Sequence, residues 1–188
     1  MHQLNGGEDV LGGPLWVCYC DYDGVVHDES VYWSRDEGIH LRTPGRALFE
    51  WLPIFEGLLA PYPDVKIVLS TSWVRARSLE FAKAQLSPTL QARVIGATFD
   101  NRVTQKLEFD IMPRGLQVWH DVERRKPEKW FAIDNDGHGW PAWCRNHLIK
   151  TEDRLGLSDI GVQNAIRKVL ASFCSSEIIT AGGVLLIE

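Results

Sequence analysis

The sequence predicts an α/β protein whose parallel sheet is covered by helices on both faces, and three observations indicate this fold. Short apolar runs alternate with amphipathic segments along the chain, which is typical of repeated strand–helix units. The three clearest runs end on polar residues, namely Asp21, Ser70 and Asp134. Of the 188 residues, 45% are apolar and 24% are charged, as in an ordinary globular protein. We therefore expect a loose tail at residues 1–14 and one α/β domain at residues 15–188.

Buried strands are expected where short apolar runs are bounded by polar residues or turn signals. These runs are residues 15–20, 65–69, 93–95, 129–133 and 148–149. A further run at residues 183–187 predicts either a last strand or an extension docked on the domain.

Helices are expected where apolar residues recur every three or four positions. These segments are residues 43–59, 74–85, 113–122 and 158–173. Thr43 and Pro44 predict the start of the first helix, because a hydroxyl residue caps a helix and proline suits its first position. Pro53 is expected to bend this helix. Residues 100–110 are expected to form a polar connection.

Composition and charge exclude several functional classes. The formal net charge of −5 argues against broad, sequence-independent binding of nucleic acids. No apolar stretch is long enough to cross a bilayer and the first residues lack the pattern of a signal peptide, so we expect a cytoplasmic protein without membrane contact. The four cysteines include no CxxC pair, which argues against a zinc site or a disulfide framework. The six histidines are scattered, and they give no support for histidine-based catalysis.

The first apolar run ends in Asp21-Tyr22-Asp23-Gly24. Glycine permits a sharp turn, so this pattern places Asp21 at the end of a strand and Asp23 on the loop above it. Acid-rich turns after strands are also common in a purely structural role. The motif by itself therefore leaves a catalytic and a structural interpretation open.

Polar residues follow the later runs in a defined order: Ser70 and Thr71, then Arg114, then Asp134, Asn135 and Asp136. Together with the DxDG motif, this order resembles the haloacid dehalogenase-like (HAD) superfamily of phosphohydrolases. In that superfamily a DxD motif follows the first strand, Ser or Thr follows the second, Lys or Arg opens a helix, and an acidic element follows a later strand. The resemblance spans residues 15 to 150 and implies a three-layer, Rossmann-like α/β/α domain.

The resemblance implies a catalytic role for both acids of the motif. Asp21 would attack phosphorus and become a transient aspartyl-phosphate. Asp23 would be the general acid for the leaving oxygen and then the base for water. Because the branch of the superfamily that cleaves haloacids lacks the second acid, Asp23 favours phosphoryl chemistry.

The same resemblance implies the residues that bind the phosphoryl group. Ser70, or Thr71 if the strand runs one residue longer, would donate a hydrogen bond to a phosphoryl oxygen. Arg114 would offset the charge that spreads onto those oxygens. Lys106 is the main alternative to Arg114.

A metal ion is expected because an anionic carboxylate does not easily approach a phosphate dianion. Mg²⁺ held by Asp21, Asp134 and the backbone carbonyl of Asp23 would shield that repulsion. Asn135 replaces the second acid of a plain DD element, and Asp136 then takes an outer-shell role. Asn135 and Asp136 are therefore candidates for the outer shell of the metal.

Neither interval that holds a cap domain in this superfamily is long enough here for a full cap. Only a flap at residues 27–42 is expected over the site. An open site admits either a phosphorylated small molecule or a phosphorylated nucleic-acid end. Water must then be excluded by the flap or by a partner.

Eight tryptophans are many for a chain of this length, and four are expected near the strand ends: Trp33, Trp73, Trp140 and Trp143. They either stack on a nucleobase or fill the core and loops. Ser70-Thr71-Ser72-Trp73 also resembles a bacterial and phage branch related to HAD domains of RNA-repair proteins. An Arg often follows the Trp there, whereas here Val74 precedes Arg75.

Other functional classes fit the sequence less well. A receiver domain carries its accepting Asp after the third strand, and a nucleotide-sugar transferase does not require hydroxyl and basic residues in this order. A catalytically silent module that binds phosphate or a protein remains the alternative. Asn135 and the choice between two basic residues are the observations that keep it open.

Overall fold

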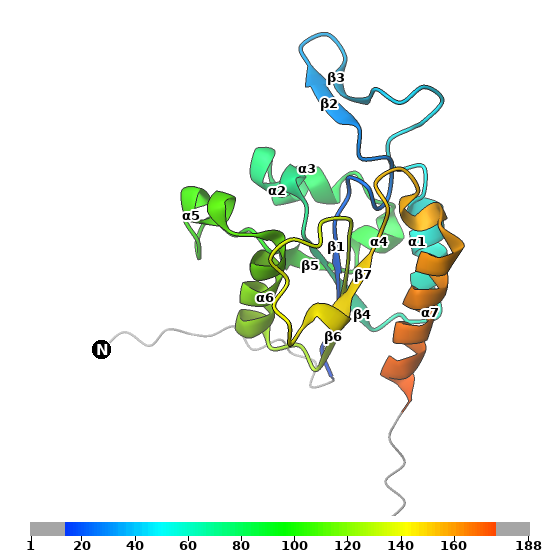
Figure 1. Ribbon diagram of the computed structural model, residues 1–188, viewed down its shortest axis with the longest axis vertical. Coiled ribbons are helices and arrows are strands. Elements are labelled where there is room, and N and C mark those ends of the chain that lie inside the picture. The colour runs from blue at the N-terminus through cyan, green and yellow to red at the C-terminus, as the bar shows by residue number, and fades with distance from the viewer. Residues whose placement is uncertain (1–13, 176–188) are drawn as a thin grey trace, which may run out of the picture.

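The computed structural model describes residues 14–175, and its centre is a five-stranded parallel sheet (Figure 1). The strands are β1 (Trp16–Cys20), β4 (Val65–Leu69), β5 (Val94–Ala97), β6 (Lys129–Asp134) and β7 (Leu148–Lys150). They lie in the order β5-β4-β1-β6-β7, so the predicted α/β fold with a parallel sheet is confirmed. The tail predicted at residues 1–14, apart from Pro14, and the segment predicted at residues 183–187 lie outside the described residues.

The middle strand β1 is buried on both faces because its side chains alternate between two cores. The covering helices are α1 (Leu52–Leu59), α6 (Arg114–Arg125) and α7 (Ile160–Cys174). Val17 and Tyr19 pack in the core that α6 covers. Cys18 and Cys20 pack in the core that α1 and α7 cover. Figure 1 shows α1 and α7 together on one side of the sheet and α6 on the other.

The order of the strands determines where a ligand can bind. From β1 the chain passes to β4 and β5 on one side, and then returns to β6 and β7 on the other side of β1. Parallel α/β sheets bind their ligands at the carboxyl ends of the strands, at such a reversal. The carboxyl end of β1 is therefore the expected position of the site.

The first predicted helix begins later than expected. Residues 43–51 form turns, and α1 starts at Leu52. Phe49 adopts a positive φ of 61°, and its backbone N–H donates to Nδ1 of His27 at 3.2 Å instead of to a helical carbonyl. Pro53 lies in the first turn of α1, where its missing N–H costs no hydrogen bond. The bend predicted at Pro53 is therefore wrong.

The second predicted helix, at residues 74–85, is two short helices. They are α2 (Ser72–Ala76) and α3 (Leu79–Lys83), and α4 (Pro88–Gln91) follows. Arg77 leaves the helical conformation, with φ −125° and ψ −89°. Ser78 then caps α3, because its hydroxyl accepts the Phe81 N–H at 3.0 Å.

The connection predicted at residues 100–110 contains a helix, α5 (Lys106–Ile111). Phe109 of α5 is buried and packs on Phe99 with 5.0 Å between ring centroids. The last helix starts at Ile160 because Asp159 caps it, after two 3₁₀ turns, η1 (Arg145–His147) and η2 (Gly156–Ser158). No helix in residues 14–175 combines the length and apolar character needed to cross a bilayer.

The segment predicted as a flap contains a β-hairpin. Its strands are β2 (Val31–Ser34) and β3 (Gly38–Leu41), paired antiparallel. Figure 1 shows the hairpin projecting away from the sheet. Tyr32 and Trp33 of β2 are exposed.

Gly115 lies where α6 meets the loop that carries Trp140. A Cβ at Gly115 would lie 2.4 Å from the Cα of Trp140, so Gly115→Ala must push backbone apart, and we expect it to lower the free energy of unfolding by about 1–3 kcal/mol. Gly57 in α1 has open space at its Cβ position, and the control Gly57→Ala is expected to raise that free energy by about 0.4–1 kcal/mol. Urea unfolding followed by circular dichroism measures both. A Gly115→Ala variant as stable as the wild type would contradict this packing.

Candidate active site

Asp21 follows β1 directly and is fixed at the carboxyl end of the sheet. Its backbone N–H donates to the carbonyl of Ile133 at 3.1 Å, which continues the pairing of β1 with β6. Its Oδ1 accepts the N–H of Tyr22 at 2.7 Å, and its Oδ2 accepts a hydrogen bond from Nη2 of Arg114 at 3.2 Å. The side chain is buried. One carboxylate is therefore held where the two central strands end.

Arg114, the first residue of α6, connects three strand ends. Besides its bond to Asp21, its Nε lies 3.2 Å from Oδ2 of Asp134. Its Nη1 donates to the backbone carbonyl of Ser70 at 2.6 Å. Lys106 lies on α5 and lines a different hollow. Of the two basic candidates, the structure brings Arg114 to the acids.

Burial and mutual repulsion set the ionisation of the two acids. Burial raises the pKa of Asp21 to about 6, although Arg114 opposes the shift. Burial, and then the charge of Asp21, raise the pKa of Asp134 well above its usual value. Burial favours the neutral form of Arg114, but Asp21 and Asp134 raise its pKa, so the guanidinium stays charged. When both acids ionise, one guanidinium faces two buried carboxylates, and this arrangement attracts a cation.

Two buried polar groups at these strand ends have no hydrogen-bond partner within residues 14–175. They are Oδ2 of Asp134, which contacts Arg114 without hydrogen-bond geometry, and the hydroxyl of Ser70. The Thr71 hydroxyl caps α2 by accepting the Trp73 N–H at 3.4 Å, and it also lowers the pKa of Asp21. Of the two hydroxyls, that of Ser70 therefore has no hydrogen-bond partner in the described part of the chain, while that of Thr71 contacts Asp21.

The side chains of Trp73 and His27 hold Asp23, and neither contact was predicted from the sequence. Its Oδ1 accepts hydrogen bonds from Nε1 of Trp73 at 2.9 Å and from Nε2 of His27 at 3.0 Å. Because Nδ1 of His27 accepts the N–H of Phe49, the ring carries its proton on Nε2. This Nε2–H donates the hydrogen bond to Asp23. The Asp23 side chain keeps 26% of its surface exposed, whereas that of His27 has none. One oxygen is thus fixed from the protein interior while the carboxylate still reaches solvent.

The two outer-shell candidates point in different directions. The Asn135 amide donates to Oδ1 of Asp153 at 3.0 Å. Asp136 stays beside the acids, because its N–H donates to Oδ1 of Asp134 at 2.9 Å. Of the two residues, Asp136 therefore lies beside Asp134, and the side chain of Asn135 is engaged with Asp153.

A hollow of about 580 Å³ gives access to Arg114 from solvent. Its lining includes Ser72, Arg75, Arg114, Asp136 and His138. We call it the inner hollow. Asp21 and Asp134 do not line this hollow, but Arg114 does, and its guanidinium contacts both acids.

The four tryptophans fall into two groups. Trp73 and Trp140 are buried, and Nε1 of Trp140 donates to the carbonyl of Asp136 at 3.1 Å. Trp33 and Trp143 are 63% and 68% exposed, so both are free to contact a ligand. Trp33 lines a hollow with Asp23.

The parallel sheet, with an acid directly after β1, another at the end of β6 and an arginine at the start of the helix before β6, defines a HAD-like α/β domain. Residues 17–162 match the family described as "HAD domain in Swiss Army Knife RNA repair proteins", and the chain belongs to this family. The predicted relation to HAD domains of RNA-repair proteins is thereby confirmed. No curated protein and no solved structure gives a significant match. Membership indicates a hydrolase of the phosphatase type.

Proposed function

We propose that the protein is a Mg²⁺-dependent phosphomonoesterase that acts through an aspartyl-phosphate on Asp21. The observation that carries the proposal is the single guanidinium of Arg114, which contacts Asp21, Asp134 and the Ser70 carbonyl at the carboxyl end of the sheet. The substrate is a phosphorylated small molecule or a phosphorylated nucleic-acid end. The family match supports the hydrolase class.

In the first step a carboxylate oxygen of Asp21 attacks phosphorus, and the bond from phosphorus to the ester oxygen breaks. Asp23 gives its proton to that oxygen as it leaves. In the second step Asp23 takes a proton from water, the water oxygen attacks phosphorus, and the aspartyl-phosphate bond breaks to release inorganic phosphate. Arg114 and the free Ser70 hydroxyl bind the phosphoryl oxygens throughout.

The donor set fits Mg²⁺, which prefers carboxylate and carbonyl oxygens. Asp21 and Asp134 are buried, and among the described residues Oδ2 of Asp134 has no hydrogen-bond donor. Asp23 would supply its backbone carbonyl. Residues 14–175 contain no group of three His, Cys, Asp or Glu side chains placed to hold a metal, and Mg²⁺ commonly binds through one or two carboxylates and keeps several waters. Enzymes of this superfamily generally use Mg²⁺, and the ion would supply charge shielding between Asp21 and the substrate phosphate.

Phosphate release from p-nitrophenyl phosphate, measured in Mg²⁺ and in EDTA, tests the proposal. We expect release in Mg²⁺ and none above background in EDTA. Thermal unfolding gives a readout without turnover: Mg²⁺ should raise the Tm of the wild type by binding the folded state, and should not raise that of Asp134→Asn. Folded protein that binds Mg²⁺ and releases no phosphate from aryl phosphates, nucleotides or oligonucleotide ends would favour the silent binding module instead.

Trp73→Phe keeps an aromatic ring in the cluster around Asp23 and removes the N–H that donates to it. We expect roughly a tenfold loss of kcat/KM on an alkyl phosphate, because one charge-assisted hydrogen bond no longer positions the acid. The loss on p-nitrophenyl phosphate is expected to stay below about threefold, since that leaving group needs little protonation. Steady-state kinetics on the two substrates provide the measurement. Trp140→Phe, whose N–H bonds to a backbone carbonyl, is the matched control, and the same loss on both substrates would count against a positioning role for Trp73.

A further inference from the structure

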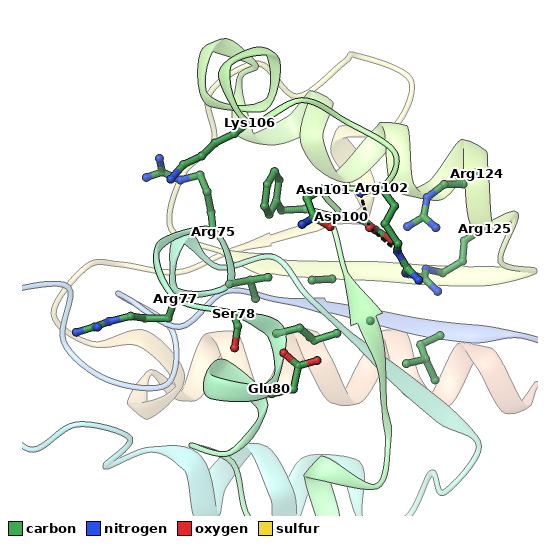
Figure 2. Close-up of a pocket in the computed structure, with 16 residues that line it drawn as sticks. Arg75, Arg77, Ser78, Glu80, Asp100, Asn101, Arg102, Lys106, Arg124 and Arg125 are labelled. Carbon is green, nitrogen blue, oxygen red and sulfur yellow. Dashed lines mark hydrogen bonds and ion pairs between the residues drawn. The ribbon is translucent and has the colours of Figure 1, made fainter.

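A second hollow, of about 670 Å³, lies beside the edge strand β5 and is rich in basic side chains. We call it the outer hollow. Its lining contains six cationic residues: Arg75, Arg77, Arg102, Lys106, Arg124 and Arg125. Figure 2 shows Arg75, Arg77 and Lys106 on one side and Arg102, Arg124 and Arg125 on the other. The cations come from α2, α5, α6 and the loops beside them, so the tertiary structure and not a sequence run gathers them.

The charge of the outer hollow differs from that of the whole chain. Four carboxylates partly neutralise the six cations. Two of them, Glu80 and Asp100, lie on the lining, and the other two, Asp110 and Asp121, form ion pairs with its arginines. A positive surplus therefore remains in a protein whose net charge is −5. In the described part of the chain, Arg77 and Lys106 form no ion pair with a carboxylate. The surplus thus lies on the side formed by Arg75, Arg77 and Lys106.

The outer hollow is adjacent to the inner hollow, and Arg75 lines both. The inner hollow reaches Arg114, and Arg114 contacts Asp21. Basic side chains therefore lead from the candidate nucleophile outwards. A small phosphomonoester needs only the inner hollow, whereas a chain of phosphates can use both.

The lining also offers groups for sugars and bases. Ile95 and Phe99 provide apolar surface, and Ser78 and Asn101 provide hydrogen-bonding groups. Gly96 leaves room for the side chain of Arg125, because a Cβ at Gly96 would lie 2.9 Å from Nη2 of Arg125. This mixture of cations, apolar surface and polar groups suits a nucleotide strand better than a simple anion.

We propose that the outer hollow binds the phosphodiester backbone of a single-stranded nucleic acid whose terminal phosphate enters the inner hollow. The inference rests on the proposed function and narrows its substrate to nucleic-acid ends. The inference is compatible with the net charge of −5. That charge argues against broad binding of nucleic acids, whereas the basic surface proposed here is local and lies beside the candidate active site. Lys106 then binds the backbone of the nucleic acid and not the phosphate that is hydrolysed.

The test compares wild type with the double variant Arg77→Gln/Lys106→Gln, because both side chains are exposed and free of ion pairs in the described residues. Arg154→Gln/Lys168→Gln removes the same charge at exposed positions away from the hollow and is the matched control. Fluorescence anisotropy measures binding of a labelled ten-nucleotide strand with hydroxyl ends, in RNA and DNA arms. We expect about tenfold weaker binding by the Arg77→Gln/Lys106→Gln variant only, with a slope of log K against log salt less steep by about 1.4, for two lost phosphate contacts.

Phosphate release separates this inference from the proposed function. In the double variant, kcat/KM on an oligonucleotide end is expected to fall about tenfold, and kcat/KM on p-nitrophenyl phosphate is expected to stay within about twofold of the wild type. Equal strand affinity in wild type and double variant, with p-nitrophenyl phosphate hydrolysed, would overturn the inference and leave the phosphatase intact. Weakened strand binding without hydrolysis of any substrate would support the outer hollow and overturn the proposed function.

Discussion

Asp21→Asn is expected to abolish phosphate release, by at least about 10⁴-fold, while the protein keeps its fold. The amide is not a nucleophile toward phosphorus, so the covalent intermediate does not form. Arg114 still contacts Asp134 and the carbonyl of Ser70, so the strand ends stay connected. Phosphate release in Mg²⁺ and circular dichroism are the measurements.

Stability gives this variant a second, independent readout. Burial raises the pKa of Asp21 to about 6, so ionisation costs folding free energy once the pH exceeds the usual value of an aspartate, and the full cost is present above about pH 6. The neutral amide avoids this cost. Asp21→Asn is therefore expected to unfold at a Tm no lower than the wild type at pH 7.5 in EDTA, and the difference should narrow as the pH falls towards 4.

The control for Asp21→Asn is Asp36→Asn, because Asp36 is an exposed acid in the turn of the hairpin. It is expected to keep full activity and an unchanged Tm. Normal turnover in purified Asp21→Asn would rule out the aspartyl-phosphate mechanism. A variant that fails to fold, as shown by a lost circular dichroism signal, would contradict the expected stability.

Asp23→Asn is expected to show a loss that depends on the leaving group. On an alkyl phosphate, whose leaving oxygen needs a proton, kcat/KM should fall by about 10²–10⁴-fold. On p-nitrophenyl phosphate the first step needs no acid, and the loss should stay below about tenfold. The amide still accepts the hydrogen bonds from Trp73 and His27 through its oxygen, so the cluster around it is retained.

A plot of log kcat/KM against the pKa of the leaving alcohol, for wild type and variant, measures this effect. We expect a steeper negative slope for Asp23→Asn. Parallel lines with an equal offset would show that Asp23 supports the site without transferring a proton. Asp136→Asn, beside the acids but without the contacts of Asp23, is the comparison variant and should leave the slope unchanged.

The sheet and the order of its polar strand ends were predictable from the sequence. A strand buried on both faces needs a mainly apolar run, and β1, β4 and β6 are such runs, with Lys66 as the polar residue inside β4. Parallel strands bring their carboxyl ends to one edge of a sheet, so Asp21, Ser70 and Asp134 had to lie near one another. The start of a helix at Arg114 was likewise readable from its apolar spacing.

Helix boundaries were less predictable, because contacts distant in sequence compete with local pattern. The spacing of apolar residues continues through residues 43–51, yet these residues form turns. The hydrogen bond from Phe49 to His27 joins residues 22 positions apart. Propensity and periodicity describe only neighbours along the chain, and they carry no information on such a bond.

What the sequence by itself determined is the class of fold and the residue types at the candidate site, because burial and strand direction act through local pattern. Only the tertiary structure decided how those residues are paired. It selected Arg114 over Lys106, turned Asn135 towards Asp153, and placed His27 and Trp73 on Asp23. Trp73 reaches Asp23 across 50 positions and Arg114 reaches Asp21 across 93. The direction of a hydrogen bond over such distances depends on how the whole core packs, and no short segment encodes it.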